Sequence, residues 1–126
     1  FGTAGAIARY YGGLANEATL GGRRLLGAAT VAGLPTTLME GRDAVLGSTR
    51  RFGRGFWLHY PVRNAVRGPR AIGHPGLGGS FGLGDPDRRL GMGYLMNLPG
   101  AYLRAANLEL AVYRSLSPGS RRYTPP

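Results

Sequence analysis

The chain has 126 residues, the length of a single domain, and its 43% hydrophobic content excludes a disordered polyelectrolyte. It contains no cysteine, which excludes disulfides, cysteine nucleophiles and thiolate zinc sites. The formal net charge of +10 is carried entirely by arginine, because the sequence has no lysine. No stretch approaches the ~18 apolar residues of a membrane-spanning helix, so no membrane span is expected. The chain shows no signal-peptide pattern, and a cytoplasmic location is favoured.

The segment 1–54 predicts two helices followed by irregular structure. Residues 3–15 have helical periodicity, and Thr3 is placed to cap the start of the helix. The shared apolar face consists of Ile7, Tyr10, Tyr11 and Leu14. After a glycine-rich turn at 19–24, residues 28–39 predict a weaker helix that Pro35 interrupts. Residues 40–54 are polar and arginine-rich, so they are expected to be irregular.

The middle of the chain predicts antiparallel strands. Residues 55–60 form a strand with Trp57 and His59 on one face, and an arginine-bearing loop follows at 61–70. Further strands are expected at 71–76, 80–84 and 90–97. In the last of these, Met92, Tyr94 and Met96 share one face and are expected to be core residues. The sequence Asp85-Pro86-Asp87 is typical of a turn between two strands.

The C-terminal part predicts one helix and a tail. Residues 101–116 have an apolar stripe made of Leu103, Ala106, Leu110 and Tyr113. Residues 117–126 are rich in proline, serine and arginine and are expected to be disordered. Helices before and after a group of antiparallel strands predict an α+β fold, with the helices packed on the sheet.

Three stretches, taken together, resemble one family. The first is Ile7-Ala8-Arg9-Tyr10-Tyr11-Gly12-Gly13-Leu14-Ala15-Asn16 with Leu20-Gly21-Gly22-Arg23-Arg24-Leu25-Leu26. The second is Gly73-His74-Pro75-Gly76-Leu77-Gly78-Gly79-Ser80-Phe81-Gly82 with Asp85-Pro86-Asp87, Leu90-Gly91, Tyr94 and Met96-Asn97. The third is the closing amphipathic helix. In this order they resemble the C-terminal part of the β-lactamases and the β-lactamase-like serine esterases, which include penicillin-binding-protein-like members. The resemblance covers residues 1–116.

This resemblance implies a partial fold. In the family the sheet is completed by N-terminal strands, and a helical domain closes the cleft. The chain opens at Phe1 directly into a helical pattern, so we expect a fragment that is incomplete without an N-terminal part. A fragment of this kind leaves a sheet edge and an apolar face uncovered. We therefore expect marginal stability of the isolated chain, or self-association through the exposed sheet.

The resemblance also implies an active-site strand. The third motif of the family reads Lys-Thr-Gly in β-lactamases and His-x-Gly in many esterases, and by position His74 and Gly76 match it. The N–H of Leu77 is then the candidate for one of two oxyanion donors. His74, Pro75, Gly76 and Gly78 are expected to border the substrate pocket. Because His74 and Pro75 replace a lysine and a hydroxyl residue, neutral acyl esters or amides are favoured over β-lactams.

The nucleophile of the family is absent from this sequence. A Ser-x-x-Lys motif needs a lysine to activate the serine, and the chain has none. Ser80 lies near His74 in the sequence, but a structural serine in a hairpin is the favoured interpretation. We therefore expect a partial serine hydrolase that is inactive alone. A degenerate, non-catalytic remnant is a further alternative.

The alternative from another class is a basic binding module. Residues 41–70 contain seven arginines against the single acid Asp43, which gives +6. The candidate basic patch is formed by Arg50, Arg51, Arg54, Arg63, Arg67 and Arg70. Nucleic acid is an unfavoured partner, because no docking element or stacking platform accompanies these charges; an acidic protein partner remains open.

Neither a metal nor a cofactor is expected. The two histidines, His59 and His74, lack a well-placed carboxylate, so they are too few for a metal site. The glycines complete no phosphate-binding loop, since such a loop also needs a lysine.

Overall fold

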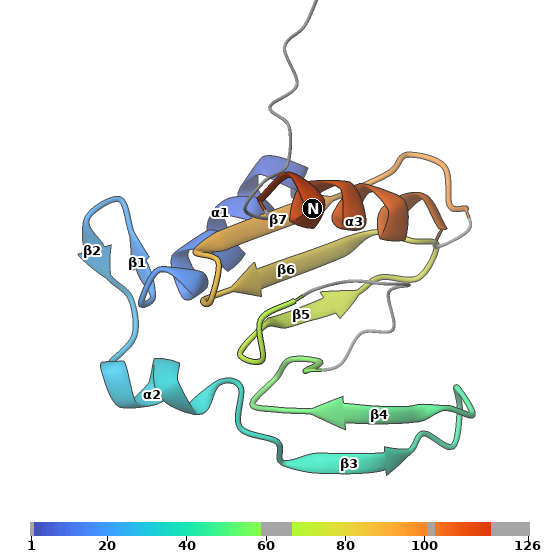
Figure 1. Ribbon diagram of the computed structural model, residues 1–126, viewed down its shortest axis with the longest axis horizontal. Coiled ribbons are helices and arrows are strands. Elements are labelled where there is room, and N and C mark those ends of the chain that lie inside the picture. The colour runs from blue at the N-terminus through green and yellow to red at the C-terminus, as the bar shows by residue number, and fades with distance from the viewer. Residues whose placement is uncertain (1, 59–66, 101–102, 117–126) are drawn as a thin grey trace, which may run out of the picture.

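The computed structural model describes residues 2–58, 67–100 and 103–116, and its elements form an α+β fold, as the sequence predicts (Figure 1). In chain order the elements are α1 (Ala4–Ala15), β1 (Thr19–Leu20), β2 (Arg23–Arg24), α2 (Ala28–Gly33), β3 (Met39–Arg42), β4 (Thr49–Phe52), β5 (Ile72–Pro75), β6 (Phe81–Asp85), β7 (Leu90–Tyr94) and α3 (Leu103–Leu116). The strands are antiparallel throughout. The tail at 117–126 and His59 lie outside the described residues.

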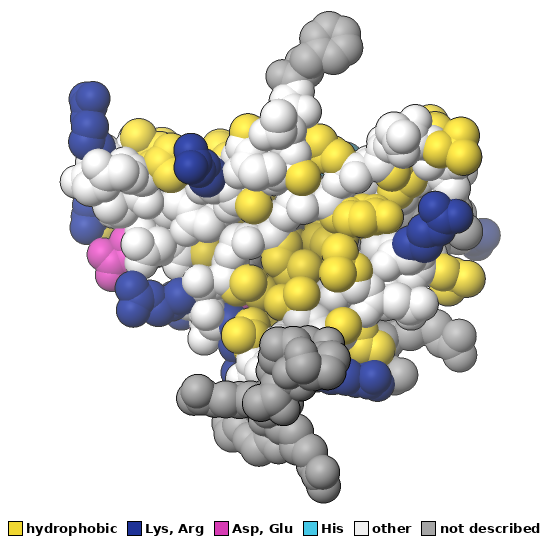
Figure 2. All heavy atoms as spheres, turned by 90° about the horizontal axis from the view of Figure 1, so that it is seen from above, with side chains coloured by type: hydrophobic (Ala, Val, Ile, Leu, Met, Phe, Trp, Pro, Cys, Tyr) yellow, Lys and Arg dark blue, Asp and Glu magenta, His cyan; other side chains and the backbone are white. Residues whose placement is uncertain are grey.

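The centre of the fold is a three-stranded sheet in the order β5-β6-β7. The β3–β4 hairpin is linked to the outer edge of β5 by isolated bridges through Trp57. The opposite edge of the sheet is formed by β7, which pairs with β6 and has no second strand partner among the described residues. Figure 2 looks down on this side and shows apolar side chains gathered in the middle of the face, with arginines around its rim.

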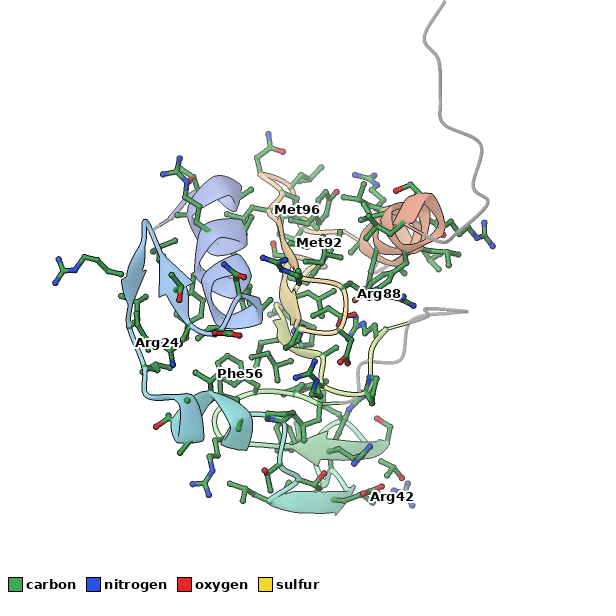
Figure 3. The ribbon with its side chains drawn as sticks, turned by 60° about the vertical axis from the view of Figure 1, so that its left-hand side comes forward. Arg24, Arg42, Phe56, Arg88, Met92 and Met96 are labelled. Carbon is green, nitrogen blue, oxygen red and sulfur yellow. The ribbon has the colours of Figure 1, made fainter. Side chains whose placement is uncertain are left out.

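The two faces of the sheet differ because glycine alternates with apolar residues in β6 and β7. Leu83 and Met92 belong to a buried cluster with Ala105 and Tyr113 of α3. The glycines between them turn to the other face, which α1 covers: these are Gly82, Gly84, Gly91 and Gly93. A Cβ atom on Gly93 would lie 2.5 Å from the carbonyl oxygen of Ala4. The helix backbone therefore rests directly on the sheet. Figure 3 shows α1 and α3 on opposite sides of the sheet, with Met92 on the side of α3.

The first helix confirms its sequence prediction. Thr3 caps α1, because its hydroxyl accepts a hydrogen bond from the Ala6 N–H at 3.1 Å. Its buried face includes Tyr11 and Leu14, whereas Tyr10 is 52% exposed. Of the four residues of the expected apolar face, Tyr11 and Leu14 are buried, Ile7 is half-buried, and Tyr10 is turned toward solvent.

Three predictions for the middle of the chain are wrong. The second helix is shorter than 28–39 and ends at Gly33, because the ring of Pro35 supplies no N–H for a further turn. Residues 39–52 are not irregular, since β3 and β4 pair from Met39–Phe52 to Arg42–Thr49. Within 55–58 there is no strand, only the isolated bridges of Trp57. An arginine-rich hairpin escapes detection because its side chains alternate without an apolar face.

The contact of α3 with the sheet also differs from the prediction. Leu103 is 59% exposed, and the buried positions are Ala105, Glu109 and Tyr113. Glu109 is fully buried and accepts hydrogen bonds from both Nε and Nη2 of Arg67, the second at 2.7 Å. The apolar-stripe pattern does not predict this buried face of α3, because the carboxylate of Glu109 stands at its centre.

A second buried carboxylate ties α3 to the β6–β7 turn. Asp85 is fully buried, and its oxygens accept hydrogen bonds from Gly68 N–H at 2.8 Å, Asp87 N–H at 3.0 Å and the Tyr113 hydroxyl at 2.7 Å. Burial, followed by the bond to Asp85, raises the pKa of Tyr113. Asp85 is therefore more than a turn residue, since it joins three segments of the chain.

Acid is expected to weaken the fold partly through Asp87. Burial alone would raise the pKa of this carboxyl, but hydrogen bonds from the N–H of Arg70 (3.0 Å) and its guanidinium (2.7 Å) outweigh burial and lower the pKa. A pKa that is lower in the folded state contributes stability that is fully present above the ordinary carboxyl pKa, and this contribution is lost as the pH falls below it through the lowered folded-state pKa. Urea unfolding at pH 7 and pH 3 should therefore show a smaller loss of stability for Asp87→Asn than for the unmodified chain. Equal losses would contradict this role.

Candidate active site

An open groove of about 440 Å³ lies between the N-terminal half of α1 and the start of the β5–β6 connection. Its walls come from Ile7, Tyr10 and Tyr11 on one side and from His74 and Gly76 on the other, with Leu95 also on the lining. Most of this surface is apolar, so the groove suits a small hydrophobic group with a polar centre near the imidazole.

His74 faces α1 because it pairs with Gly82, and both residues line the groove. Its side chain is exposed, and no hydrogen bond holds either ring nitrogen within the described part of the chain. The imidazole instead contacts the indole of Trp57, with ring centroids 5.4 Å apart at 60°. Both nitrogens are therefore available to a bound molecule.

The β5–β6 connection is a tight turn built from glycine. Gly79 N–H donates to the carbonyl of Gly76 at 3.2 Å, and Gly78 has a φ of +85°. This is the geometry of a type II turn with Leu77 at its second position. The Leu77 side chain is 99% exposed, and its N–H donates no hydrogen bond to any described residue. The turn therefore presents a free backbone donor two residues after Pro75, next to Gly76 of the groove.

The structure brings only part of the predicted pocket residues to the groove. His74 and Gly76 line the groove, whereas Pro75, Leu77 and Gly78 do not. Gly78 packs against Pro99, and its carbonyl accepts the N–H of Gly100 at 2.9 Å. The roles of these residues toward a substrate remain predictions.

Ser80 also lines the groove, and it serves the turn through its backbone. Its carbonyl accepts the Gly76 N–H at 2.6 Å, and no hydrogen bond joins its hydroxyl to His74. This placement agrees with a structural serine.

The sequence pattern predicts Tyr10 and Tyr11 only as part of the apolar face of a helix. In the fold both line the groove, and their rings meet edge to face with centroids 5.3 Å apart. Burial, with a further effect from Tyr10, raises the pKa of Tyr11. No signal in the sequence identifies these tyrosines as groove residues, because the groove depends on how α1 packs against β6.

Most arginines of the predicted basic patch contact different partners. Arg67 is buried against Glu109, so it belongs to no exposed patch. Arg70 pairs with Asp87 at 2.7 Å, and Arg51 pairs with Glu40 at 3.2 Å. Arg50 lies 4.8 Å above the ring of Trp57, and Arg54 is exposed. Arg63 lies outside the described residues.

In the part of the chain that the structure describes, no group of three or more histidine, aspartate or glutamate side chains comes together as a metal site. None of the described helices combines the length and apolar character of a membrane span.

The chain is similar to proteins of one known family. The family model "Beta-lactamase" matches residues 1–114. A penicillin-binding protein homolog from Caulobacter crescentus is 37% identical with a TM-score of 0.81, over 90% of this chain and 32% of that one. A family VIII carboxylesterase is 36% identical with a TM-score of 0.74, over 88% and 31%.

A third solved structure, EstA from Arthrobacter nitroguajacolicus Rue61a, is 30% identical with a TM-score of 0.71, over 90% of this chain and 32% of that one. No curated protein matches the chain. The chain spans about a third of the length of the solved structures, so it represents part of their fold. With nearly its whole length matched by one family model, the chain belongs to the beta-lactamase family.

Proposed function

We propose that this chain is the part of a serine hydrolase that supplies one wall of an acyl groove, the imidazole of His74 and one oxyanion donor. The observation that carries the proposal is the groove itself, with His74 on its wall and the free N–H of Leu77 next to it. The nucleophilic serine and its lysine come from a part of the protein outside this chain, because the sequence contains no lysine.

In the proposed reaction the serine oxygen attacks the carbonyl carbon of an ester, and its proton passes to the lysine. The negative charge that develops on the carbonyl oxygen is stabilised by the N–H of Leu77 together with the N–H of the serine. The carbon–oxygen bond to the alcohol then breaks, and the alcohol leaves with a proton. Water attacks the acyl-enzyme and releases the carboxylic acid. His74 contacts an oxygen of the ester or of the intermediate through a ring nitrogen.

The substrate class follows from the groove. Ile7, Tyr10 and Leu95 give it an apolar lining that suits a small acyl group. His74 and Pro75 offer neither the constant positive charge nor the hydroxyl that would bind a carboxylate. Together these features favour neutral small esters over β-lactams, in keeping with a family VIII carboxylesterase among the matching structures.

The isolated chain is expected to hydrolyse neither a chromogenic butyrate ester nor a cephalosporin. Turnover by the purified chain that disappears in His74→Ala would overturn the proposal that the nucleophile lies elsewhere. The positive test is a hybrid esterase, in which this chain replaces the segment that it matches in the family VIII carboxylesterase. Hydrolysis of p-nitrophenyl butyrate by this hybrid would support the proposal.

Leu77→Pro in the hybrid esterase is expected to lower kcat on the order of 100-fold, the usual effect of losing one oxyanion donor. Proline removes the N–H, and it is favoured at the second position of a type II turn, so the loop geometry is kept. Leu77→Ala is the matched control, because the side chain is 99% exposed and its removal leaves the N–H in place. Equal kcat values for the two variants would exclude Leu77 as an oxyanion donor.

A further inference from the structure

We infer that Trp57 is a positioning residue, which orients the imidazole of His74 toward the groove. This inference rests on the proposed function of the groove. The backbone of Trp57 is paired with that of Gly73. The Trp57 N–H donates to the carbonyl of Gly73 at 2.8 Å, and the Gly73 N–H donates to the carbonyl of Trp57 at 3.1 Å. These two bonds fix Trp57 beside the residue that precedes His74, although no strand continues there.

The indole is held by neighbours from the β3–β4 hairpin. Phe52 meets it edge to face, with centroids 5.2 Å apart at 84°. The guanidinium of Arg50 lies 4.8 Å above the ring, which is a favourable cation–π distance. The Nε of Arg50 is buried and has no hydrogen-bond partner among the described residues, so its placement depends on this stacking. The indole is therefore supported by two side chains of one strand, and it has little freedom to turn.

His74, in contrast, has few restraints of its own. Its nitrogens make no hydrogen bond with the described residues, and its ring contacts the indole of Trp57 with centroids 5.4 Å apart. An exposed histidine without such a contact moves among several rotamers. The contacts of Arg50 with Trp57 and of Trp57 with His74 thus connect strand β4 to the wall of the groove. Trp57 itself does not line the groove, so it acts through His74 and not on a substrate.

The contact can be measured in the chain as it stands, because Trp57 is the single tryptophan. The imidazole covers part of the indole, so acrylamide should quench the emission of Trp57 more strongly in His74→Ala than in the unmodified chain. Glu17→Gln, at an exposed ion pair elsewhere in the chain, is the matched control and should leave the quenching unchanged. Equal quenching in His74→Ala and the unmodified chain would overturn the inference.

The effect on catalysis is measured in the hybrid esterase. Trp57→Ala is expected to lower kcat by about 10-fold to 100-fold with little change in KM, since a misdirected group affects the transition state more than ground-state binding. Trp57→Phe should restore most of the rate, because an aromatic ring remains against His74. Equal kcat values for Trp57→Ala and the unmodified hybrid would refute the positioning role even if ester hydrolysis is seen. A hybrid that never hydrolyses esters would contradict the proposed function instead, and the fluorescence quenching alone would then decide whether Trp57 contacts His74.

Discussion

Replacing Arg67 with methionine is expected to lower the free energy of unfolding by about 3–5 kcal/mol, the usual result of leaving one member of a buried ion pair without its partner. Glu109 is fully buried, and the substitution removes both hydrogen bonds that it accepts from the guanidinium. Since domains of this size are stable by about 5–15 kcal/mol, such a loss is a large part of the total. Urea unfolding followed by far-UV circular dichroism at neutral pH measures it.

An exposed ion pair provides the matched control. Glu17 and Arg24 lie 3.3 Å apart with side chains 81% and 50% exposed, so Glu17→Gln should cost less than about 1 kcal/mol. The double variant Arg67→Met, Glu109→Leu should regain most of the stability, because it leaves no buried charge. If Arg67→Met were no more harmful than Glu17→Gln, the buried pair would not be what holds α3 to the sheet.

The second large effect is expected for Gly91→Val, which should destabilise the chain by about 3 kcal/mol or prevent folding. A Cβ at this position would overlap the backbone of Gly12 and approach the carbonyl oxygen of Ala8 to 2.6 Å. Neither neighbour is a flexible side chain, so α1 itself would have to move away from β7. The same urea titration measures the change.

Gly41→Ala is the control for Gly91→Val. Gly41 lies in the exposed strand β3, and a Cβ added there meets nothing within 4 Å. Its effect should stay within about 0.5 kcal/mol. A similar small effect for Gly91→Val would show that α1 does not rest on the sheet as described.

The parts of the fold that the sequence predicts are those with a local signal. The first helix has a capping threonine and a helical period, and the β6–β7 hairpin has alternating residues around an Asp-Pro-Asp turn. The β3–β4 hairpin lacks such a signal, because β3 is exposed and the half-buried strand β4 carries arginine where an apolar face would stand. The burial of Glu109 is also not predicted, because a carboxylate in a helix is expected to face solvent. Its partner Arg67 comes from a distant segment of the chain, so the sequence pattern does not reveal the ion pair.

In the candidate site, too, only the residues with a local sequence signal are predicted. His74 and Gly76 are neighbours in one short motif, so a resemblance over a few residues was enough to select them, and both line the groove. The opposite wall comes from Tyr10 and Tyr11, and the support of the imidazole comes from Trp57. These partners meet His74 only through packing of separate elements, which spacing along the chain does not reveal.

The glycine-lined face of the sheet fixes how α1 can lie on the strands. Gly82 pairs with His74, and its missing side chain leaves room for the ring of Tyr11. At Gly91 and Gly93 main chain meets main chain, so the spacing between helix and sheet is set by atoms that have no rotamers to exchange. Substitutions in the groove walls should therefore change the shape of the groove through side chains alone, without moving α1.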